Sequence, residues 1–207
     1  MKRTLFTLVA VIMTAHAVEL AAQQPSQPSQ LTERGSAVVD GRPLPYVIHR
    51  LPVDAFPLLP EKIVAALEER GCTIPQTYEA HQPENVVHGS FSAMGADDWA
   101  VLCSVKGEVS LLVFSDGSQP DASEHPTVLA AAKETQRLQQ QREGNDLLGF
   151  NWGIDRATPG EVHEAQTGME RRPAAPDHDA LADSVIEHRT VYRFYAKGHW
   201  TTLDMPN

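Results

Sequence analysis

Apolar residues alternate with other residues most regularly between positions 99 and 114. The odd-numbered positions of 99–105 are all apolar, and residues 109–114 are mostly apolar on both faces of an extended chain. Lys106-Gly107 separates the two runs, and Asp116-Gly117 follows the second. An alternating run followed by a nearly continuous one, each closed by turn residues, predicts a hairpin that includes a central strand.

Three other stretches carry the signals of helices. Pro60 suits the first turn of a helix whose apolar residues fall on one side and which ends before Gly71. Thr158-Pro159-Gly160-Glu161 has the spacing of a capping box and predicts the start of a short helix. Pro126 to Arg142 is polar with interspersed Ala and Leu, and it predicts a third helix.

Short apolar runs predict the remaining strands. Residues 86–91 contain one such run, and residues 148–154 alternate strictly with one apolar face. Residues 190–195 and 199–203 flank Ala196-Lys197-Gly198 and predict a second hairpin. Hairpins with a few segregated short helices predict an α+β fold with a mixed or antiparallel sheet.

The first 22 residues have the layout of a secretory signal peptide. Lys2-Arg3 precedes an apolar run over 5–13, and small residues then allow cleavage after Ala17 or after Ala22. We therefore predict an exported protein, periplasmic or secreted. Residues 23–37 begin with a Gln/Pro/Ser-rich tract and predict a disordered lead-in, which leaves 38–205 as a single domain.

Charge narrows the classes of function. The 207 residues include 27 Asp and Glu against 17 Lys and Arg, for a formal net charge of -10. Because a phosphate-binding surface needs clustered Lys and Arg, we expect no nucleic-acid partner. The apolar run near the N-terminus is shorter than the roughly 20 residues that cross a bilayer as a helix, so we expect no membrane span after signal cleavage.

Export would also place the two cysteines in a compartment where a disulfide can form. Cys72 and Cys103 are the only cysteines, so in an oxidising compartment they form the only possible intramolecular pair. We predict a disulfide between them, closing a loop of about 30 residues. Two buried free thiols are the alternative.

One segment resembles a known repeat. The positions that match are Gly89, Phe91, Gly95, Asp98, Ala100 and Val101. They resemble the strand–loop–strand unit of FG-GAP repeats, which also occurs singly in small exported proteins such as periplasmic lysozyme inhibitors. In intact units the loop commonly binds Ca²⁺, but here Ser90, Ser92 and Met94 stand where the pattern has Asp or Asn. Since Ca²⁺ requires several oxygen ligands, we interpret the loop as a turn without its metal, in which Asp98 accepts backbone N–H bonds.

More broadly, the motifs F-P-L-L-P, R-G-C-T-I-P-Q, D-W-A-V-L-C-S and V-Y-R-F-Y-A-K-G-H-W resemble a family of exported bacterial proteins of unknown function. This resemblance supports the domain limits and implies no activity. The lysozyme-inhibitor resemblance implies a protein that blocks the cleft of an enzyme, and an acidic surface suits a basic partner.

The acidic residues after His178 form a candidate metal site. On a helix, Asp179, Asp183 and Glu187 would share one face, where a divalent cation can bind. A solvated acidic stripe is the favoured interpretation. The sequence contains no H-E-x-x-H motif and no Cys/His cluster with zinc spacing, so we expect no metal and no cofactor.

Aromatic residues near the C-terminus form a candidate binding face. Tyr192, Tyr195 and Trp200 suit contact with a glycan or a peptide, since Tyr and Trp dominate interface energetics. More often, such residues close the core of a terminal hairpin.

No catalytic residue is assigned from these patterns. The sequence has no G-x-S-x-G elbow, no S-x-x-K, no P-loop and no G-x-G-x-x-G. We expect a non-catalytic binding, inhibitory or structural module of the bacterial envelope, with an envelope protein or glycan as candidate partner. The alternative is a small secreted hydrolase whose site is assembled from dispersed residues.

Overall fold

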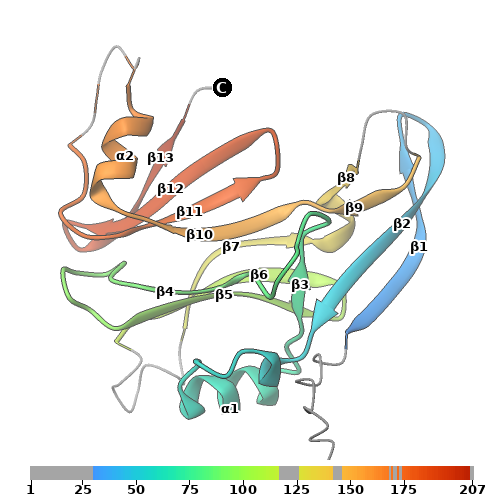
Figure 1. The fold of residues 1–207 in the computed structure, drawn as a ribbon, viewed down its shortest axis with the longest axis horizontal. Helices are drawn as coiled ribbons and strands as arrows, with labels where there is room; N and C mark the ends of the chain where they lie inside the picture. Colours follow the sequence, from blue (N-terminus) through green and yellow to red (C-terminus); the bar gives the residue numbers. More distant parts are fainter. Residues whose placement is uncertain are drawn as a thin grey trace, which may run out of the picture.

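The computed structural model describes residues 30–116, 126–141, 146–167, 169, 172 and 174–205. These residues form three β-sheets and two short α-helices (Figure 1). The predicted signal peptide, residues 1–22, lies outside the described residues, as does the first part of the predicted lead-in. Within the described residues, no helix is both long and apolar enough to span a bilayer.

The central sheet contains the hairpin that the sequence predicted. Its antiparallel strands, in spatial order, are β4 (Val86–Gly89), β5 (Asp98–Val105), β6 (Glu108–Phe114) and β7 (Thr127–Lys133). β5 and β6 are joined at Lys106 and Gly107, with φ of 52° and 81°. Two consecutive left-handed residues match the twist of the flanking strands, as in tight hairpin turns.

The alternation along β5 separates two cores. Trp99, Val101 and Cys103 face a core shared with α1 (Glu61–Glu69), while Ala100 and Leu102 face a second core on the other side of the sheet. The second core contains residues of all three sheets, among them Ile48, Phe150, Trp152, Ile154 and Leu181. Figure 1 shows the layers that result, with α1 below the central sheet, the C-terminal strands above it and the N-terminal strands at the side.

The N-terminal sheet is mixed. Its members are β1 (Leu31–Val39), β2 (Arg42–Leu51), β3 (Ile74–Gln76), β8 (Leu138–Gln140) and β9 (Leu148–Phe150). β1, β2, β9 and β8 follow one another in space, and β3 pairs with β2 at its far end. The β2–β9 pair is parallel and the others are antiparallel.

The C-terminal sheet is antiparallel throughout. Its strands, in order, are β10 (Trp152–Ala157), β11 (Ala180–Val185), β12 (Arg189–Ala196) and β13 (His199–Asp204). β12 and β13 form the predicted C-terminal hairpin, which turns at Lys197 and Gly198, both with positive φ. The face turned away from the central sheet packs against α2 (Pro159–Ala165) in a third, smaller core around Val162 and Phe194.

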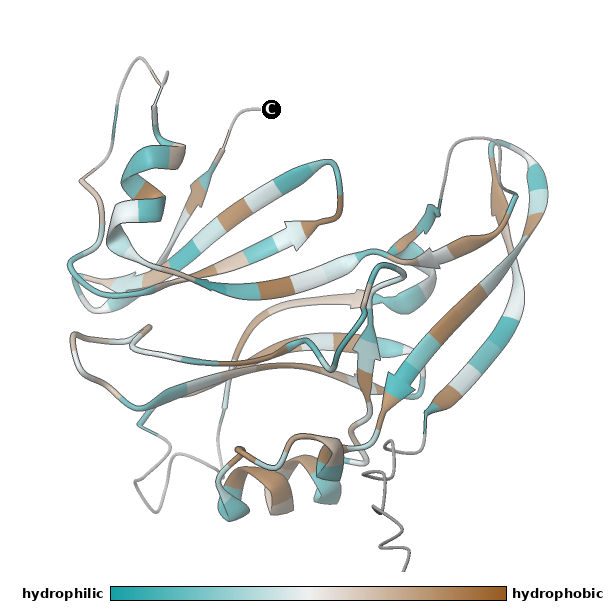
Figure 2. Ribbon diagram, in the orientation of Figure 1, coloured by the Kyte–Doolittle hydropathy of each residue, from teal (hydrophilic) through white to brown (hydrophobic). Residues whose placement is uncertain are grey.

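Both predicted helix boundary signals are present in the structure. α1 follows Pro60, and Gly71 beyond its end has φ of +71°. The buried residues of α1 are Ile63, Ala66 and Leu67, at the spacing of one helix face. Figure 2 shows hydrophobic and hydrophilic residues interspersed along this helix. Thr158 caps α2: its Oγ accepts from the N–H of Glu161, whose carboxylate accepts from the Thr158 N–H, as a capping box requires.

The helix predicted over residues 126–142 is wrong. This segment forms β7, a short 3-10 turn (Glu134–Gln136) and β8. Helix-favouring alanines occupy β7 because the strand pairs with β6 and its partly buried Leu129, Ala130 and Ala132 pack against the second core. Tertiary pairing has therefore overridden the intrinsic preference of the segment.

The expected start of ordered structure is also corrected. Residues 31–37, assigned to a disordered lead-in, form most of β1, which pairs with β2 residue by residue. The fold class holds in part: the sheets are mixed or antiparallel and the helices short, but the described residues are dominated by strands rather than evenly α+β.

The predicted disulfide is confirmed. Cys72 and Cys103 are bonded, with their Cα atoms 5.2 Å apart. Both residues are buried in the core that α1 shares with the central sheet. The bond therefore ties the end of α1 to the middle of β5.

A cleft between β2, β3 and the loop after β3

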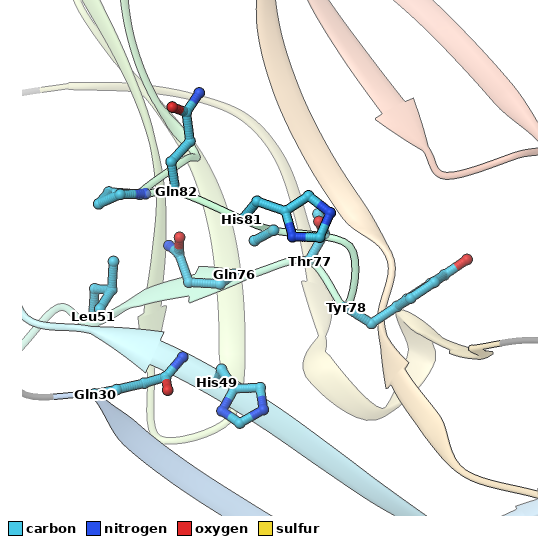
Figure 3. A pocket seen from close by; sticks show the side chains of 10 residues that line it. Gln30, His49, Leu51, Gln76, Thr77, Tyr78, His81 and Gln82 are labelled. Atoms are coloured by element: carbon cyan, nitrogen blue, oxygen red, sulfur yellow. The ribbon is translucent and has the colours of Figure 1, made fainter.

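A cleft of about 370 Å³ lies beside the free end of β3. Figure 3 shows its walls: Gln30 and His49 on one side, His81 and Gln82 on the other, and Gln76 and Leu51 between them. The full lining consists of Gln30, His49, Leu51, Gln76, Thr77, Tyr78, Ala80, His81, Gln82 and Pro83.

The loop that forms one wall is closed by reciprocal hydrogen bonds. Gln76 is 4% exposed, and its Nε2 donates to the carbonyl oxygens of Ile74 and Glu84, each at 3.1 Å. Its Oε1 accepts from the Glu84 N–H at 2.9 Å, and the Thr77 N–H donates to Glu84 Oε1 at 2.6 Å. The two ends of the loop are therefore held together by side chains that act like a short stretch of sheet.

Asn85 anchors the same loop to the C-terminal sheet. It is 1% exposed, and its Nδ2 donates to the carbonyl oxygens of Pro75 and Trp152. Its Oδ1 accepts from the Ile154 N–H at 3.0 Å. Asn85 has φ of 70°, a conformation that Asn adopts more readily than most residues. A fully bonded buried amide gives the cleft a rigid base.

Tyr78 joins the loop to β9. Its N–H donates to the Phe150 carbonyl at 2.9 Å, and its hydroxyl accepts from Gln139 Nε2 at 3.4 Å. The ring extends away from Gln30 and Leu51 in Figure 3. Partial burial, followed by the negative charges of Glu187 and Glu79, raises the pKa of Tyr78, so the hydroxyl stays protonated at neutral pH.

The opposite wall comes from the first two strands. His49 lies near the end of β2, and its Nδ1 is 3.2 Å from the Thr32 hydroxyl of β1. His49 as a whole is half-buried and lines the cleft together with Gln30. β1 thus helps to fix the orientation of a lining residue.

The lining contains no Asp, Glu, Lys or Arg, although 21% of the chain is charged. Of the two carboxylates in the loop, Glu84 accepts the Thr77 N–H, and Glu79 is not among the lining residues. Amide, imidazole and hydroxyl groups both donate and accept hydrogen bonds without a fixed charge. This arrangement favours an uncharged polar ligand, because a charged one would find no counter-ion among these side chains.

The residues that resemble the FG-GAP unit lie elsewhere, between β4 and β5. Asp98 is completely buried, and its carboxylate accepts the N–H groups of Ser92 at 2.6 Å and Asp116 at 2.8 Å. Phe91 is also fully buried, and Gly95 has φ of +76°. Gly89 pairs with Asp98 at the base of the loop. The predicted backbone-binding role of Asp98 is therefore present in the structure.

The candidate aromatic face is divided between two surfaces. Tyr195 and Trp200 are direct cross-strand partners, with ring centroids 5.9 Å apart in an edge-to-face arrangement. Tyr192 points to the opposite face of β12, where it packs against the third core. Because side chains alternate along a strand, Tyr192 and Tyr195 cannot share a face.

The expectation that Asp179, Asp183 and Glu187 share one face of a helix is wrong. Residues 180–185 form β11, in which Asp183 is buried and accepts from Trp152 Nε1 at 2.6 Å and from Arg193 at 2.7 and 2.8 Å. Asp179 instead accepts from the Ser90 N–H, and Glu187 lies in the turn after β11 with φ of 59°. Across the part of the chain that the structure describes, no three His, Cys, Asp or Glu residues are grouped as metal ligands.

The cleft residues were not predicted from the sequence. They come from β1, β2, β3 and an irregular loop, so no spacing relates Gln30 and His49 to residues 76–83. A local excess of Gln and His in residues 76–82 is the only signal, and it has no period.

Comparisons with known proteins add no further assignment. No protein-family model matches the chain, and neither a curated protein nor a solved structure is significantly similar to it.

Proposed function

We propose that this protein is an exported, non-catalytic binding module of the cell envelope and that the cleft of Figure 3 binds a neutral glycan. The observation that carries the proposal is the uncharged lining, in which amides and imidazoles from two separate walls face one space.

Sugar hydroxyls match these groups because each hydroxyl donates one hydrogen bond and accepts others. Gln30 and Gln82 offer an amide on each wall, and His49 and His81 offer an imidazole on each. Leu51 and Pro83 provide apolar surface for the C–H faces of a sugar ring. A few polar groups on a partly apolar surface are typical of small-ligand sites.

The same lining supports binding rather than glycan hydrolysis. Most glycosidases need two Asp or Glu residues on either side of the bond they break. None of the ten residues that line the cleft has a carboxylate. The alternative, a small secreted hydrolase, would require the cleft to convert its ligand.

Calorimetric titration tests the proposal. The full chain is expressed for export, recovered from the medium or periplasm, and titrated with neutral tetrasaccharides of N-acetylglucosamine and of glucose. We expect at least one to bind, with affinity about tenfold lower in Gln82→Ala and in His49→Ala, because each variant removes one polar contact of a buried ligand. His163→Ala, an exposed histidine on α2, is the matched control and retains wild-type affinity.

Three results would overturn the proposal. The first is absence of binding to every neutral tetrasaccharide. The second is equal affinity in all variants, and the third is cleavage of the probe during the titration. Tight binding to a basic lysozyme without binding to any glycan would place the function in the inhibitory class instead.

A further inference from the structure

The strand β1 lies at a sheet edge that has little protection against pairing with another strand. It has nine residues, more than any other strand at the end of a sheet, and among the described residues it pairs with β2 alone. This pairing runs from Leu31 to Val39 without a bulge. β1 contains no Lys and no Pro, and its two charged residues, Glu33 and Arg34, have opposite signs. Since edge strands are commonly short, bulged or rich in Lys or Pro, this edge indicates a place where another strand binds.

The prolines of β2 show which backbone groups of β1 point away from the hairpin. Pro43 lies opposite Val38, and Pro45 lies opposite Ser36. Because proline has no N–H, these are pairs whose backbone groups do not bond across the hairpin. Bonding alternates along an antiparallel pair, so the even-numbered residues of β1 direct their N–H and C=O groups outward. These residues are Thr32, Arg34, Ser36 and Val38.

The exposed side chains of β1 have a symmetric pattern. Leu31 at one end is 49% exposed, and Val38 and Val39 at the other end are 73% and 38% exposed. They are three of the six large apolar side chains that are exposed among the described residues. Charged and small residues, 33–37, lie between them. A strand with apolar residues at both ends matches an antiparallel copy of itself, because antiparallel pairing brings opposite ends together.

One register pairs two copies of β1 over their whole length. It places the two-fold axis at Gly35, so that Leu31 faces the partner's Val39 and Arg34 faces the partner's Ser36. The four outward-pointing residues of each copy then face those of the other. Each such pair exchanges two hydrogen bonds, for about eight backbone hydrogen bonds in all.

The centre of β1 suits this register. Gly35 gives the central pair, where facing Cα atoms come closest, no side chains of its own. The end of the Tyr46 ring occupies that space instead, since a Cβ on Gly35 would lie 2.5 Å from it. The Tyr46 hydroxyl and Arg50 both donate to the Glu33 carboxylate, which is thus paired within its own chain. Glu33 faces the partner's Ala37, so neither charged residue of β1 directly opposes a like charge.

We propose that β1 binds the β1 of a second copy of this chain, which joins the two N-terminal sheets into one continuous sheet across a two-fold axis. Figure 1 shows the β1–β2 hairpin at the side of the molecule, away from the C-terminal sheet. The proposal does not depend on glycan binding, because no residue of β1 lines the cleft.

Opposite charges at one position test both the partner and the register. Ser36 is exposed and faces the partner's Arg34, so each substitution acts twice across the two-fold axis. Ser36→Glu should lower the dimer Kd about fivefold, and Ser36→Lys should raise it about fivefold, because cross-strand pairs of opposite charge attract and those of like charge repel. Sedimentation equilibrium of the full chain, expressed for export, measures each Kd. We expect about 10–100 µM for the wild type, as for a small interface.

The net charge of the chain makes the order of these variants informative. Both copies carry a formal charge of -10, so an added Glu increases their general repulsion and an added Lys reduces it. General repulsion therefore predicts the opposite order. Thr127→Glu and Thr127→Lys, at an exposed residue of β7, are the matched controls and should show only this small general effect. High salt should reduce the difference between the two Ser36 variants.

Amide hydrogen exchange locates the interface. In dilute solution the amides of residues 33, 35, 37 and 39, which face β2, should exchange slowly, and those of 32, 34, 36 and 38 rapidly. Above the Kd, the even-numbered amides should become protected. Three results would overturn the proposal: a wild-type chain that stays monomeric up to about 1 mM, Ser36 variants whose Kd values follow the general-charge order, and even-numbered amides that exchange equally fast at both concentrations.

Discussion

Two hairpins of this protein have the same turn and very different surroundings. β1 and β2 are joined by Asp40 and Gly41, with φ of 51° and 76°, and β5 and β6 by Lys106 and Gly107, with φ of 52° and 81°. β5 and β6 are buried on both faces, whereas β1 is exposed along nearly its whole length. In Figure 1 the β1–β2 hairpin stands at the side of the molecule and β5–β6 lies at its centre.

The difference between the two hairpins shows which structural features leave a pattern in the sequence. Burial imposes apolar residues, so the β5–β6 hairpin is visible in the sequence. Backbone pairing imposes nothing on the side chains of an exposed edge strand, so β1 has no clear alternation. The turn does leave a trace: Asp-Gly between two strands is a strong hairpin signal, and it was available at positions 40 and 41.

Proline made β2 harder to recognise. Pro43 and Pro45 are two residues apart, so both nitrogens point to the same side of the strand. β3 and β9 pair with β2 only from Tyr46 onward, so within the described residues no partner on that side requires the missing N–H groups. The prolines are therefore compatible with the sheet where it has only one neighbour.

The largest contrast between the hairpins should appear in core truncation. Leu102→Ala in β5 should lower the free energy of unfolding by about 4 kcal/mol, because its side chain is completely buried. Val38→Ala in β1 should change it by less than about 0.5 kcal/mol, because that side chain is 73% exposed. Urea unfolding measures both, and similar losses would mean that β1 is buried in solution.

The next effect concerns the cross-link beneath β5. Replacing both Cys72 and Cys103 with Ser should destabilise the protein by about 3 kcal/mol, since the disulfide closes a loop across 31 positions. Unfolding of the oxidised wild type with and without reductant gives an independent value. A reductant effect near zero would contradict the assigned pairing.

A smaller effect distinguishes buried from exposed ion pairs within the C-terminal sheet. Asp183→Asn should lower the free energy of unfolding by about 2 kcal/mol, because Arg193 loses its buried carboxylate partner. The amide oxygen of the new side chain can still accept the hydrogen bond from Trp152. The exposed pair of Arg189 and Asp204 supplies the matched control. Asp204→Asn should lower the free energy of unfolding by less than about 1 kcal/mol. A larger loss for Asp204→Asn than for Asp183→Asn would contradict the prediction that the buried ion pair contributes more.

The smallest effect concerns the attachment of β1. The hydrogen bond from Arg50 lowers the pKa of Glu33, with a smaller contribution from the Tyr46 hydroxyl. A lowered folded-state pKa stabilises the protein above the unfolded value of 4.5, and this contribution is lost as the pH falls through the folded-state pKa. Glu33→Gln should therefore melt slightly below wild type at pH 7, and this difference in melting temperature should shrink as the pH is lowered below 4.5. A difference that grows in acid would contradict this sign.

The parts of the fold that could be predicted from the sequence are those set by local signals, and the parts that could not are those set by distant partners. The α1 boundaries, the two tight hairpins at 106–107 and 197–198, and the disulfide followed from capping, turn and redox arguments that need only local sequence. β7 and β11 were missed because alanines and isolated acids in them are explained only by distant partners, such as β6 for Ala130 and Arg193 for Asp183. The cleft was missed for a related reason, since it combines segments that are far apart in the chain.

The most direct test of the cleft as the functional site is a backbone ¹⁵N–¹H titration with a neutral tetrasaccharide that binds. The account predicts that the perturbed amides cluster at residues 76–82 and 49–51, around Gln82 and His49. Amides of the buried β5–β6 hairpin should remain unchanged in the same spectra. Perturbations confined to the β12–β13 hairpin tip, with residues 76–82 unmoved, would contradict it.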